Sequence, residues 1–450
     1  MSNSIRLFAF TLILALCLSG TLSAQVFGHW ESRSPMPVKR SNMATASIVF
    51  GDTTFVYTFM GIDSTKACGT GIRLEAFKLN TTTGIWSQIA DVPDSEGRIA
   101  ASATAYNGKI YLLGGYKVFN NCSETTSPNV DIYDPATDTW SSGANIPTPT
   151  DDHVQFLYRD SLIYTISGWS QNTNTRLTQI YDPANDTWTG GTIFPSSGLF
   201  GHCGALSGDT LLIIDGVRIQ GFNFVLINQV VEGIIDQMDP TVISWSLIGT
   251  HPGAKVYRGG SFAHGGRIIT TGGTNNAYNI DGIGYNNVPS VESGRTFGFD
   301  LASQTWEDYA RNPDSVMDVR EIVRVNGNEY YVVGGMEAGQ SVTNKVSAFV
   351  VDSVLVQVDP PRVEILDLRM RMGSDGRSHV IEVGCDPNQG LELQIWGLDG
   401  QQLHEHRLEA GQRTHQIFLQ EWIGGLSTGA YILRVWQGED ARALKFPIWD

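Results

Sequence analysis

The sequence predicts an all-β protein in which a six-bladed β-propeller is followed by a small immunoglobulin-like β-sandwich. Glycine contributes 49 of 450 residues and charged residues only 17%, which favours short strands and tight turns over long helices. The second observation is a repeat. Tryptophan recurs about every fifty residues, at Trp30, Trp86, Trp140, Trp188, Trp245 and Trp306.

Residues 1–24 have the composition of a secretory signal peptide. Arg6 precedes the apolar run LFAFTLILALCLSG, and LSA stands before Gln25. This run is too short for a stop-transfer helix. Cys17 suggests a lipoprotein, but Leu16 occupies a position where a lipobox needs a small residue. We therefore expect export into an oxidising environment.

Residues 25–358 contain the repeat, and its best copy shows how each unit is built. GRIAASATAYNGKIYLLGG is followed by VDIYDPATDTW, and TQIYDPANDTW comes 48 positions later. The glycines end a buried strand where a neighbouring backbone leaves no room for a side chain. Asp-Pro ends the next strand, and the tryptophan fills space between adjacent sheets. Each unit therefore predicts four antiparallel strands, which bury both faces only in a radial array.

These phrases resemble the kelch repeat, and the resemblance covers roughly Gln25 to Asp352. It implies a six-bladed kelch propeller. The fourth unit departs from the pattern, with DG for the glycine pair and QMDP for YDP, and the first unit has MG. Strand ends with glycine occur at Gly61, Gly115, Gly168, Gly216, Gly273 and Gly335.

The sixth unit lacks a closing tryptophan strand, whereas the mature chain begins with the unpaired phrase HWESRSPMP. We expect the N-terminal residues Val26–Pro37 to supply the outer strand of the last blade, beside Ser347–Val351. The segment SVLVQVD at 353–359 alternates well enough to be a rival for that position.

Residues 359–450 leave the repeat and read as short alternating strands of a small sandwich. GLSTGAYILRVWQGEDARALKFPIWD resembles the C-terminal sorting domain of the type IX secretion system. This resemblance implies that the secretion machinery is a partner, and that the protein crosses the outer membrane to be attached or released. An ordinary immunoglobulin-like domain is the alternative.

The composition argues against nucleic-acid and membrane partners, and the motifs argue against a serine nucleophile and a bound metal. The net charge of −16 argues against nucleic acid and anionic membranes, and no apolar stretch beyond the signal is long enough for a transmembrane segment. GLSTG fits G-x-S-x-G, but it leads into a strand rather than a helix. His404 and His406 lack further ligands at metal spacing, so we expect neither a metal nor another cofactor.

The mature chain keeps four cysteines. Cys68 and Cys122 each lie seven residues after a glycine mark, so they fall in equivalent loops of neighbouring blades. They are either bridged or too far apart for a disulfide. Cys203 and Cys385 stand in strand-like contexts and are expected to be buried as small apolar residues.

A set of basic residues stands near the start of each innermost strand, 14 to 21 residues before its glycine mark. If they ring one mouth of the channel, they are candidates for binding an anionic ligand. Alternatively, they hold turns and neighbouring blades together. The set comprises Arg40, Arg98, His153, His202, Arg258 and Arg320.

Three functions fit these features. We expect foremost a secreted or cell-surface binding module whose partner is a glycan, an anionic small molecule or a surface protein. The second is a carbohydrate isomerase resembling the six-bladed kelch sialate mutarotases; its candidate proton carriers are Asp152, His153, Asp318 and Glu321. The third is a structural surface-layer component. Kelch copper oxidases are disfavoured because no tyrosine–cysteine pair with further metal ligands is evident.

Overall fold

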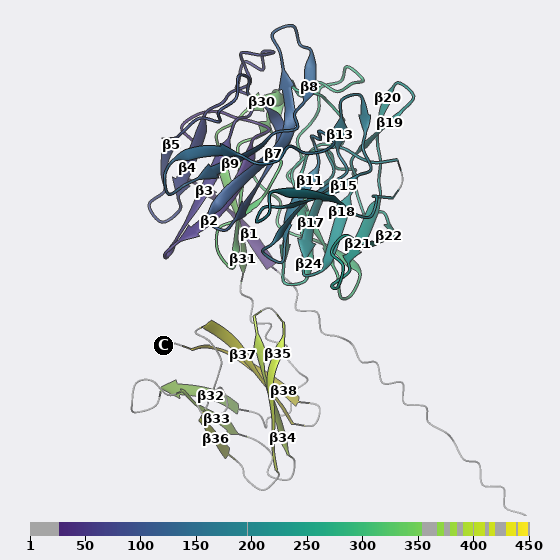
Figure 1. Ribbon diagram of the computed structural model, residues 1–450. Helices are drawn as coiled ribbons and strands as arrows, with labels where there is room; N and C mark the ends of the chain where they lie inside the picture. The colour runs from purple at the N-terminus through teal and green to yellow at the C-terminus, as the bar shows by residue number, and fades with distance from the viewer. Residues whose placement is uncertain are drawn as a thin grey trace, which may run out of the picture.

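The structure, a computed structural model, describes residues 27–195 and 197–352 of the first unit (Figure 1). Of the C-terminal unit it describes 367–372, 379–384, 390–398, 400–409, 414–418, 429–437 and 440–448. Strands dominate both units. One short 3-10 helix, Ala338–Gln340, occurs within the described residues.

The first three blades are antiparallel sheets, and the strands of each are named in order from the inner strand outward. Blade one contains β2 (Ala44–Phe50), β3 (Thr53–Phe59), β4 (Ala76–Asn80) and β5 (Ile85–Ile89). Blade two contains β6 (Ile99–Tyr106), β7 (Lys109–Val118), β9 (Val130–Asp134) and β10 (Thr139–Ser142), with β8 (Glu124–Thr126) added beside β7. Blade three contains β11 (Val154–Tyr158), β12 (Leu162–Ile166), β15 (Thr178–Asp182) and β16 (Thr187–Gly190).

The next three blades follow the same plan. Blade four contains β17 (Cys203–Ser207), β18 (Thr210–Ile214), β21 (Val230–Ile235) and β22 (Ile243–Gly249). Blade five contains β23 (Gly260–His264), β24 (Arg267–Thr271), β25 (Thr296–Asp300) and β26 (Thr305–Asp308). Blade six contains β27 (Val323–Arg324), β28 (Glu329–Val333), β31 (Val346–Asp352) and β1 (Phe27–Arg33).

Small hairpins extend from the loops of three blades. They are β13 (Trp169–Ser170) with β14 (Thr173–Asn174), β19 (Val217–Gln220) with β20 (Asn223–Leu226), and β29 (Met336–Glu337) with β30 (Ser341–Val342).

The N-terminal strand β1 forms the outer edge of blade six. It runs antiparallel to β31, with Phe27 opposite Asp352 and Arg33 opposite Val346. This is the pairing that the unpaired HWESRSPMP phrase predicts, while the rival segment 353–359 lies outside the described residues. The first and last strands of the propeller therefore share one sheet, which leaves no gap between the ends of the ring.

Six equivalent residues surround the propeller axis, one at or before the start of the inner strand of each blade. Each has a positive φ between 49° and 65°. Backbone bonds link four consecutive members, from Arg258 N to Gly201 O (2.8 Å), from Gly201 N to Asp152 O (2.9 Å) and from Asp152 N to Ala100 O (3.1 Å). We call Asn42, Ala100, Asp152, Gly201, Arg258 and Asp318 the axial residues.

The remaining links close the circle. Ala100 N donates to Asn42 Oδ1 (2.8 Å), and Asn42 N donates to Asp318 O (3.3 Å). Val319 N, next to Asp318, donates to Arg258 O (3.0 Å). The left-handed conformation is unfavourable for residues other than glycine, and the bonds between blades hold it in place.

The repeated YDPxxDTW phrase joins blade two and blade three each to the blade before it. In blade two, Trp140 Nε1 donates to Ala90 O (3.0 Å), and the indole packs 5.5 Å from the ring of Phe59 in blade one. Asp138 accepts from both Tyr133 Oη (2.7 Å) and Ala90 N (2.9 Å). Blade three repeats the contact through Trp188 and Ala144 O (2.8 Å). The near-identical phrase recurs because blades two and three make the same junction.

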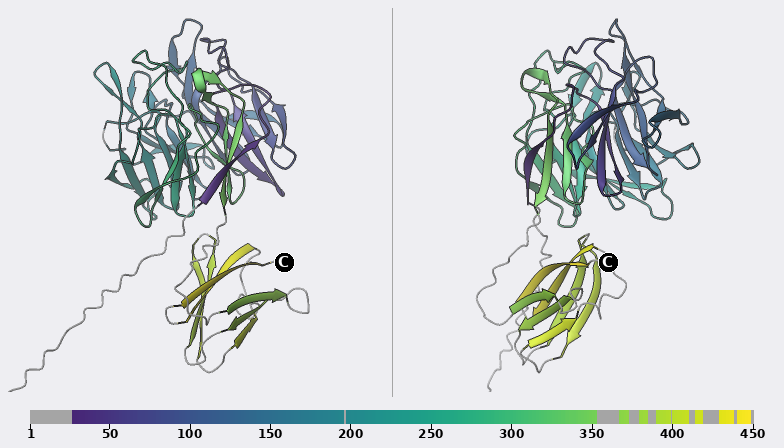
Figure 2. Two further views of the ribbon diagram at one scale, coloured as in Figure 1. Left: turned by 180° about the vertical axis from the view of Figure 1, so that it is seen from behind. Right: turned by 90° about the vertical axis from the view of Figure 1, so that its left-hand side faces the viewer.

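The C-terminal unit is a sandwich of two antiparallel sheets, shown in olive to yellow in Figure 2. One contains β32 (Asp367–Met372), β33 (His379–Gly384) and β36 (Thr414–Phe418). The other contains β35 (Gln402–Leu408), β34 (Leu391–Gly397), β37 (Gly429–Gln437) and β38 (Asp440–Ile448). Residues of both sheets, among them Ile381, Leu393 and Leu433, form one buried core.

Cys68 and Cys122 form a disulfide that joins the loops of blades one and two. Cys203 is a buried free thiol, as the sequence predicts, and Cys385 lies outside the described residues. In the part of the chain that the structure describes, no helix has the length and apolar character needed to cross a membrane.

Candidate functional site

Two arginines and a carboxylate from three blades meet at the propeller axis. Asp152 accepts from Arg258 through Nε (3.1 Å) and Nη2 (2.6 Å), and Nη1 of Arg320 bonds to the same carboxylate. The side chains of Asp152 and Arg258 are each only 2% exposed. Burial alone would raise the pKa of Asp152, but its attraction to Arg258 and Arg320 lowers the pKa to about 2. This carboxylate is therefore ionised and fully paired at neutral pH.

A second carboxylate extends the cluster toward blade one. Asp318 Oδ1 lies 3.3 Å from Arg258 Nη1, and its Oδ2 accepts from Ser41 Oγ (2.7 Å). Burial raises the pKa of Asp318, and the charge of Arg258 opposes this rise. We call Asp152, Arg258, Asp318 and Arg320 the axial ion cluster. Its four charged side chains come from blades three, five and six, and their formal charges sum to zero.

The long loop of blade five covers this cluster. Residues 275–292, here called the capping loop, connect β24 to β25, and Arg258 Nη1 donates to the backbone oxygen of its Asn279. The Asn279 side chain accepts from Tyr116 Oη (3.1 Å) and donates to Glu124 (2.5 Å), both of blade two. One loop residue thus ties blade five to blade two across the axis.

Other residues of the capping loop reach three more blades. Lys66 of blade one donates to Asp281 O (2.9 Å), and Gln340 of blade six donates to Ser290 O (2.8 Å). Tyr285 stacks on Phe224 of blade four, with ring centroids 4.0 Å apart. The capping loop therefore contacts loops of blades one, two, four and six.

Apolar side chains fill the space beneath and around this loop. A single cluster of buried residues includes Ile62, Tyr116, Phe200, Tyr278 and Met336. The partly buried Trp169 of blade three packs against it, so all six blades or their loops contribute. The rings of Tyr257 and Tyr278 lie 5.1 and 5.2 Å from the Arg258 guanidinium. This end of the channel is packed with side chains.

The six basic residues expected at one mouth do not form a ring. Counted from the axial residues, Arg40 and Arg98 stand two positions before, His153 and His202 one after, Arg258 at zero and Arg320 two after. Side chains at neighbouring positions of an extended chain point in different directions. The six basic residues therefore do not occupy equivalent positions around one mouth of the channel. Arg258 and Arg320 share the carboxylate of Asp152, and His153 and Arg320 are close enough to His202 to help lower its pKa.

The other four each bond to a partner of their own. Arg98 is 0% exposed and bonds to Asp131 and to Ser127 Oγ (3.1 Å). Arg40 pairs with Glu75 (2.9 Å). Burial lowers the pKa of His153 to about 4 and of His202 to about 3, so both are neutral at pH 7. Arg40 and Arg98 thus bond within their own blades, and His202 bonds to Ile166 O of the neighbouring blade, as in the alternative in which basic residues hold turns and blades together. Binding of an anion by these residues stays a prediction.

The candidate proton carriers also have different hydrogen-bond partners. Asp152 and Asp318 belong to the axial ion cluster, while His153 Nε2 pairs with Gln155 Oε1 (3.2 Å). Glu321 accepts from Thr45 N of blade one (3.1 Å), and burial raises its pKa to about 7. Sequence reasoning missed the capping loop and its Asn279. The long interval between Gly273 and Trp306, rich in asparagine, was the available signal.

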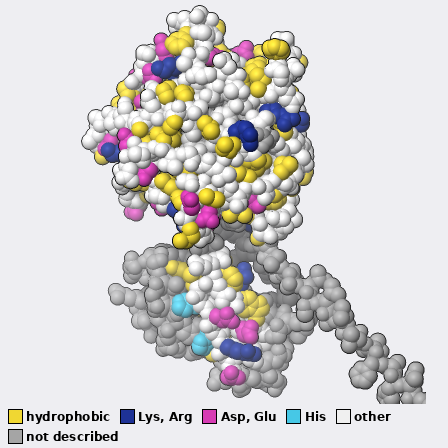
Figure 3. All heavy atoms as spheres, turned by 45° about the vertical axis from the view of Figure 1, so that its right-hand side comes forward, with side chains coloured by type: hydrophobic (Ala, Val, Ile, Leu, Met, Phe, Trp, Pro, Cys, Tyr) yellow, Lys and Arg dark blue, Asp and Glu magenta, His cyan; other side chains and the backbone are white. Residues whose placement is uncertain are grey.

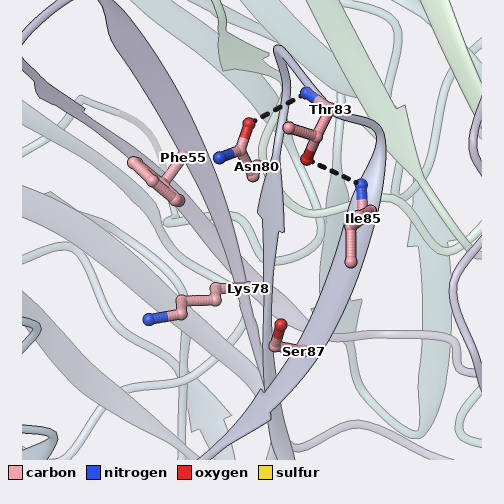
Figure 4. Close-up of a pocket in the computed structure, with 6 residues that line it drawn as sticks. All are labelled: Phe55, Lys78, Asn80, Thr83, Ile85 and Ser87. Atoms are coloured by element: carbon pink, nitrogen blue, oxygen red, sulfur yellow. Dashed lines mark hydrogen bonds between the residues drawn. The ribbon is translucent and has the colours of Figure 1, made fainter.

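Two surface hollows lie away from the axis. One, of about 260 Å³, lies on blade one and is lined by Phe55, Lys78, Asn80, Thr83, Ile85 and Ser87 (Figure 4). Its Asn80 side chain accepts from Thr83 N (3.0 Å) and so serves its own turn. The other, of about 610 Å³, lies between the loops of blades four and five. On the face shown in Figure 3, charged groups are scattered and form no large basic area.

The closed ring of antiparallel sheets defines the chain as a β-propeller. The chain contains a match to the kelch motif at residues 97–147. It is 26% identical over 150 residues to Spermatocyte protein spe-26 of Caenorhabditis elegans, which is 33% of this chain and 26% of that protein. It is 38% identical over 65 residues to Kelch-like protein 38 of Homo sapiens, 14% of this chain and 11% of that protein.

The alignments therefore span about a quarter or less of the length of these two relatives. A third relative, Kelch-like protein 25 of Xenopus laevis, is 29% identical over 23% of this chain and 15% of its own length. Among solved structures, YjhT superposes with a TM-score of 0.57 over 72% of this chain and 98% of its own, at 16% identity. At that identity the likeness concerns the fold alone.

Proposed function

We propose that this kelch propeller is an exported binding module that recognises a glycan or another protein through the loops at its capped end. The observation that carries the proposal is the packing of the axis. Asp152, Arg258, Asp318 and Arg320 neutralise one another beneath the capping loop, and their side chains are at most 5% exposed. A ligand therefore meets the loops around the axis rather than these charged groups.

The proposal includes a destination. The signal-like residues 1–24 and the resemblance of residues 359–450 to a type IX sorting domain support export across the outer membrane, followed by surface attachment or release. The secretion machinery would then be the partner of the C-terminal sandwich. The disulfide between Cys68 and Cys122 suits an oxidising compartment.

Binding of the labelled mature chain to an oligosaccharide panel and to purified envelope proteins tests this proposal. We expect saturable binding to members of one of these two sets. Absence of binding to both sets would overturn it.

A carbohydrate isomerase is the second candidate, because two carboxylates and two guanidiniums converge at the axis. Acid–base ring opening would require the capping loop to open and free Asp152 or Asp318 from Arg258. A sialic-acid anomer assay decides between the candidates. Anomer equilibration that is faster than in buffer alone, and that loses this acceleration in the Asp318→Asn variant, would favour the enzyme. A rate equal to that in buffer alone would favour the binding module.

A further inference from the structure

The groove of about 610 Å³ between blades four and five is open to solvent and has the mixed lining of a ligand site. One wall is the hairpin β19–β20, and the other is the capping loop. Aromatic rings come from both walls, Phe224 from the hairpin and Tyr285 from the loop, and their stack joins the walls. The Tyr285 side chain keeps access to solvent, since the residue is 41% exposed.

Asparagine is the most frequent residue in the lining of the groove. Asn228, Asn275, Asn276 and Asn286 all line it, and none of the twelve lining residues is acidic. Each free amide presents both a donor and an acceptor, which matches vicinal hydroxyl groups. Lys255 is the one charged lining residue, and its Nζ is anchored on Leu226 O (2.8 Å).

Two of these amides have unused hydrogen-bonding capacity. Asn228 Oδ1 is buried and has no partner among the described residues. Asn275 is exposed and, within the same described ranges, its amide makes no hydrogen bond. An unpaired buried acceptor is costly. A hydrogen bond from a ligand hydroxyl to Asn228 Oδ1 therefore stabilises binding more than a hydrogen bond to an exposed amide would.

The walls of the groove are ordered by their own bonds. Asn276 Nδ2 donates to Val288 O (2.9 Å) and lies 3.3 Å from Asn286 Oδ1, which holds the capping loop in its turn. The hairpin pairs Val217 with Leu226 and Gln220 with Asn223. A site whose walls are already ordered loses little conformational entropy when it binds.

We propose that this groove binds a saccharide, with the exposed face of Tyr285 against the C–H face of a sugar ring and the asparagine amides on its hydroxyls. The inference rests on the proposed function, since it names the ligand class and the loops of a binding module. A flat apolar surface surrounded by neutral amides suits a sugar ring, which carries C–H groups on its faces and hydroxyls on its edge. Protein docking at the same loops is the competing outcome.

Titration of the mature protein against immobilised neutral and acidic oligosaccharides tests the inference with two variants of the groove. Tyr285→Ala removes the ring face, and we expect the Kd of a bound oligosaccharide to rise by about tenfold or more. Asn275→Ala removes only a solvent-facing amide, and we expect a rise of about threefold to tenfold. Because Asn275 makes no bond within the described residues, its replacement tests binding even where loss of the Tyr285 ring disturbs the loop.

Phe50→Ala is the matched control. Phe50 is 40% exposed and packs against Phe55 in blade one, far along the chain from the groove, so its replacement should leave the Kd unchanged. Oligosaccharide binding that persists unchanged in both groove variants would overturn the site but not the binding module. If the protein binds an envelope protein and binds no oligosaccharide, a saccharide is not the ligand class of the groove. Failure to bind either would overturn the proposed function as well.

Discussion

Arg258 and Asp152 are 106 residues apart in the chain and meet through two parallel hydrogen bonds of 3.1 and 2.6 Å on the propeller axis. Both are axial residues with positive φ, at 49° and 51°. The same two residues therefore join blades through their backbones and across the axis through their side chains. A fork-shaped guanidinium suits this role because it reaches two carboxylates and a carbonyl at once.

Replacing Asp152 should destabilise the propeller strongly. Asp152→Asn leaves Arg258 and Arg320 buried without their shared counter-charge, and we expect a loss of about 3–5 kcal/mol of unfolding free energy. Urea denaturation at pH 7 measures it. Asp308→Asn is the control, because Asp308 is 68% exposed beside Arg295 and should cost less than about 1 kcal/mol. Equal losses in the two variants would contradict the stabilising role of the axial ion cluster.

Glu321 should make stability depend on pH near neutrality. Burial raises its pKa from 4.5 to about 7, so between these values the folded state holds a proton that the unfolded state has lost. This contribution is fully present below pH 4.5 and is lost as pH rises to about 7.

Glu321→Gln keeps an acceptor for Thr45 N but cannot ionise. Relative to wild type, the variant should gain about 1–3 kcal/mol between pH 4.5 and pH 7.5, given about 1.4 kcal/mol for each pKa unit. Urea denaturation at the two pH values gives this difference. A difference that does not change with pH would mean that Glu321 titrates normally in the folded protein.

The disulfide between Cys68 and Cys122 should stabilise the loops around the capped end. Its cysteines are 54 positions apart in the sequence, for which chain entropy predicts about 4 kcal/mol. We expect the double change Cys68→Ser and Cys122→Ser to lower the free energy of unfolding by this amount. Dithiothreitol should reproduce the loss in wild type and leave the double variant unchanged. Sensitivity of the double variant to the reductant would point to another thiol.

Closure of the ring should depend on β1. Its Trp30 packs 5.2 Å from Phe349 and donates to Ala310 O (2.8 Å) of the neighbouring blade. Deleting residues 25–37 exposes the edge of β31 and should abolish cooperative unfolding of the propeller. The milder Trp30→Ala should cost about 2–4 kcal/mol, whereas Trp30→Phe should retain part of the packing. Wild-type stability of the deletion would show that another segment closes the ring.

Export should depend on the C-terminal unit and not on the propeller. Truncation before Gly390 should leave the protein in the periplasm of a host with a type IX secretion system, since it removes most strands of the proposed sorting domain. Fractionation and immunoblotting measure the distribution. The Asp308→Asn variant of the full chain serves as a control for normal export, and surface delivery of the truncated chain would refute the sorting role.

The strands, their order and the junctions between blades were determined by local sequence. Alternating apolar residues, Asp-Pro and the glycine pair act within a few residues, and Trp140 and Trp188 mark equivalent contacts because both follow the same turn. The unpaired phrase around Trp30 likewise reveals a strand that needs a partner. Such features repeat with the blade and are visible without coordinates.

The tertiary structure alone decided which side chains meet at the axis. A displacement of one or two residues turns a side chain away from the axis, so Arg98 pairs with Asp131 of its own blade while Arg258 reaches Asp152 of another blade. The capping loop adds contacts from Asn279 and Tyr285 to blades two and four. Because these partners lie far apart in the chain and the loop has no repeat, their pairing depends on the closed ring.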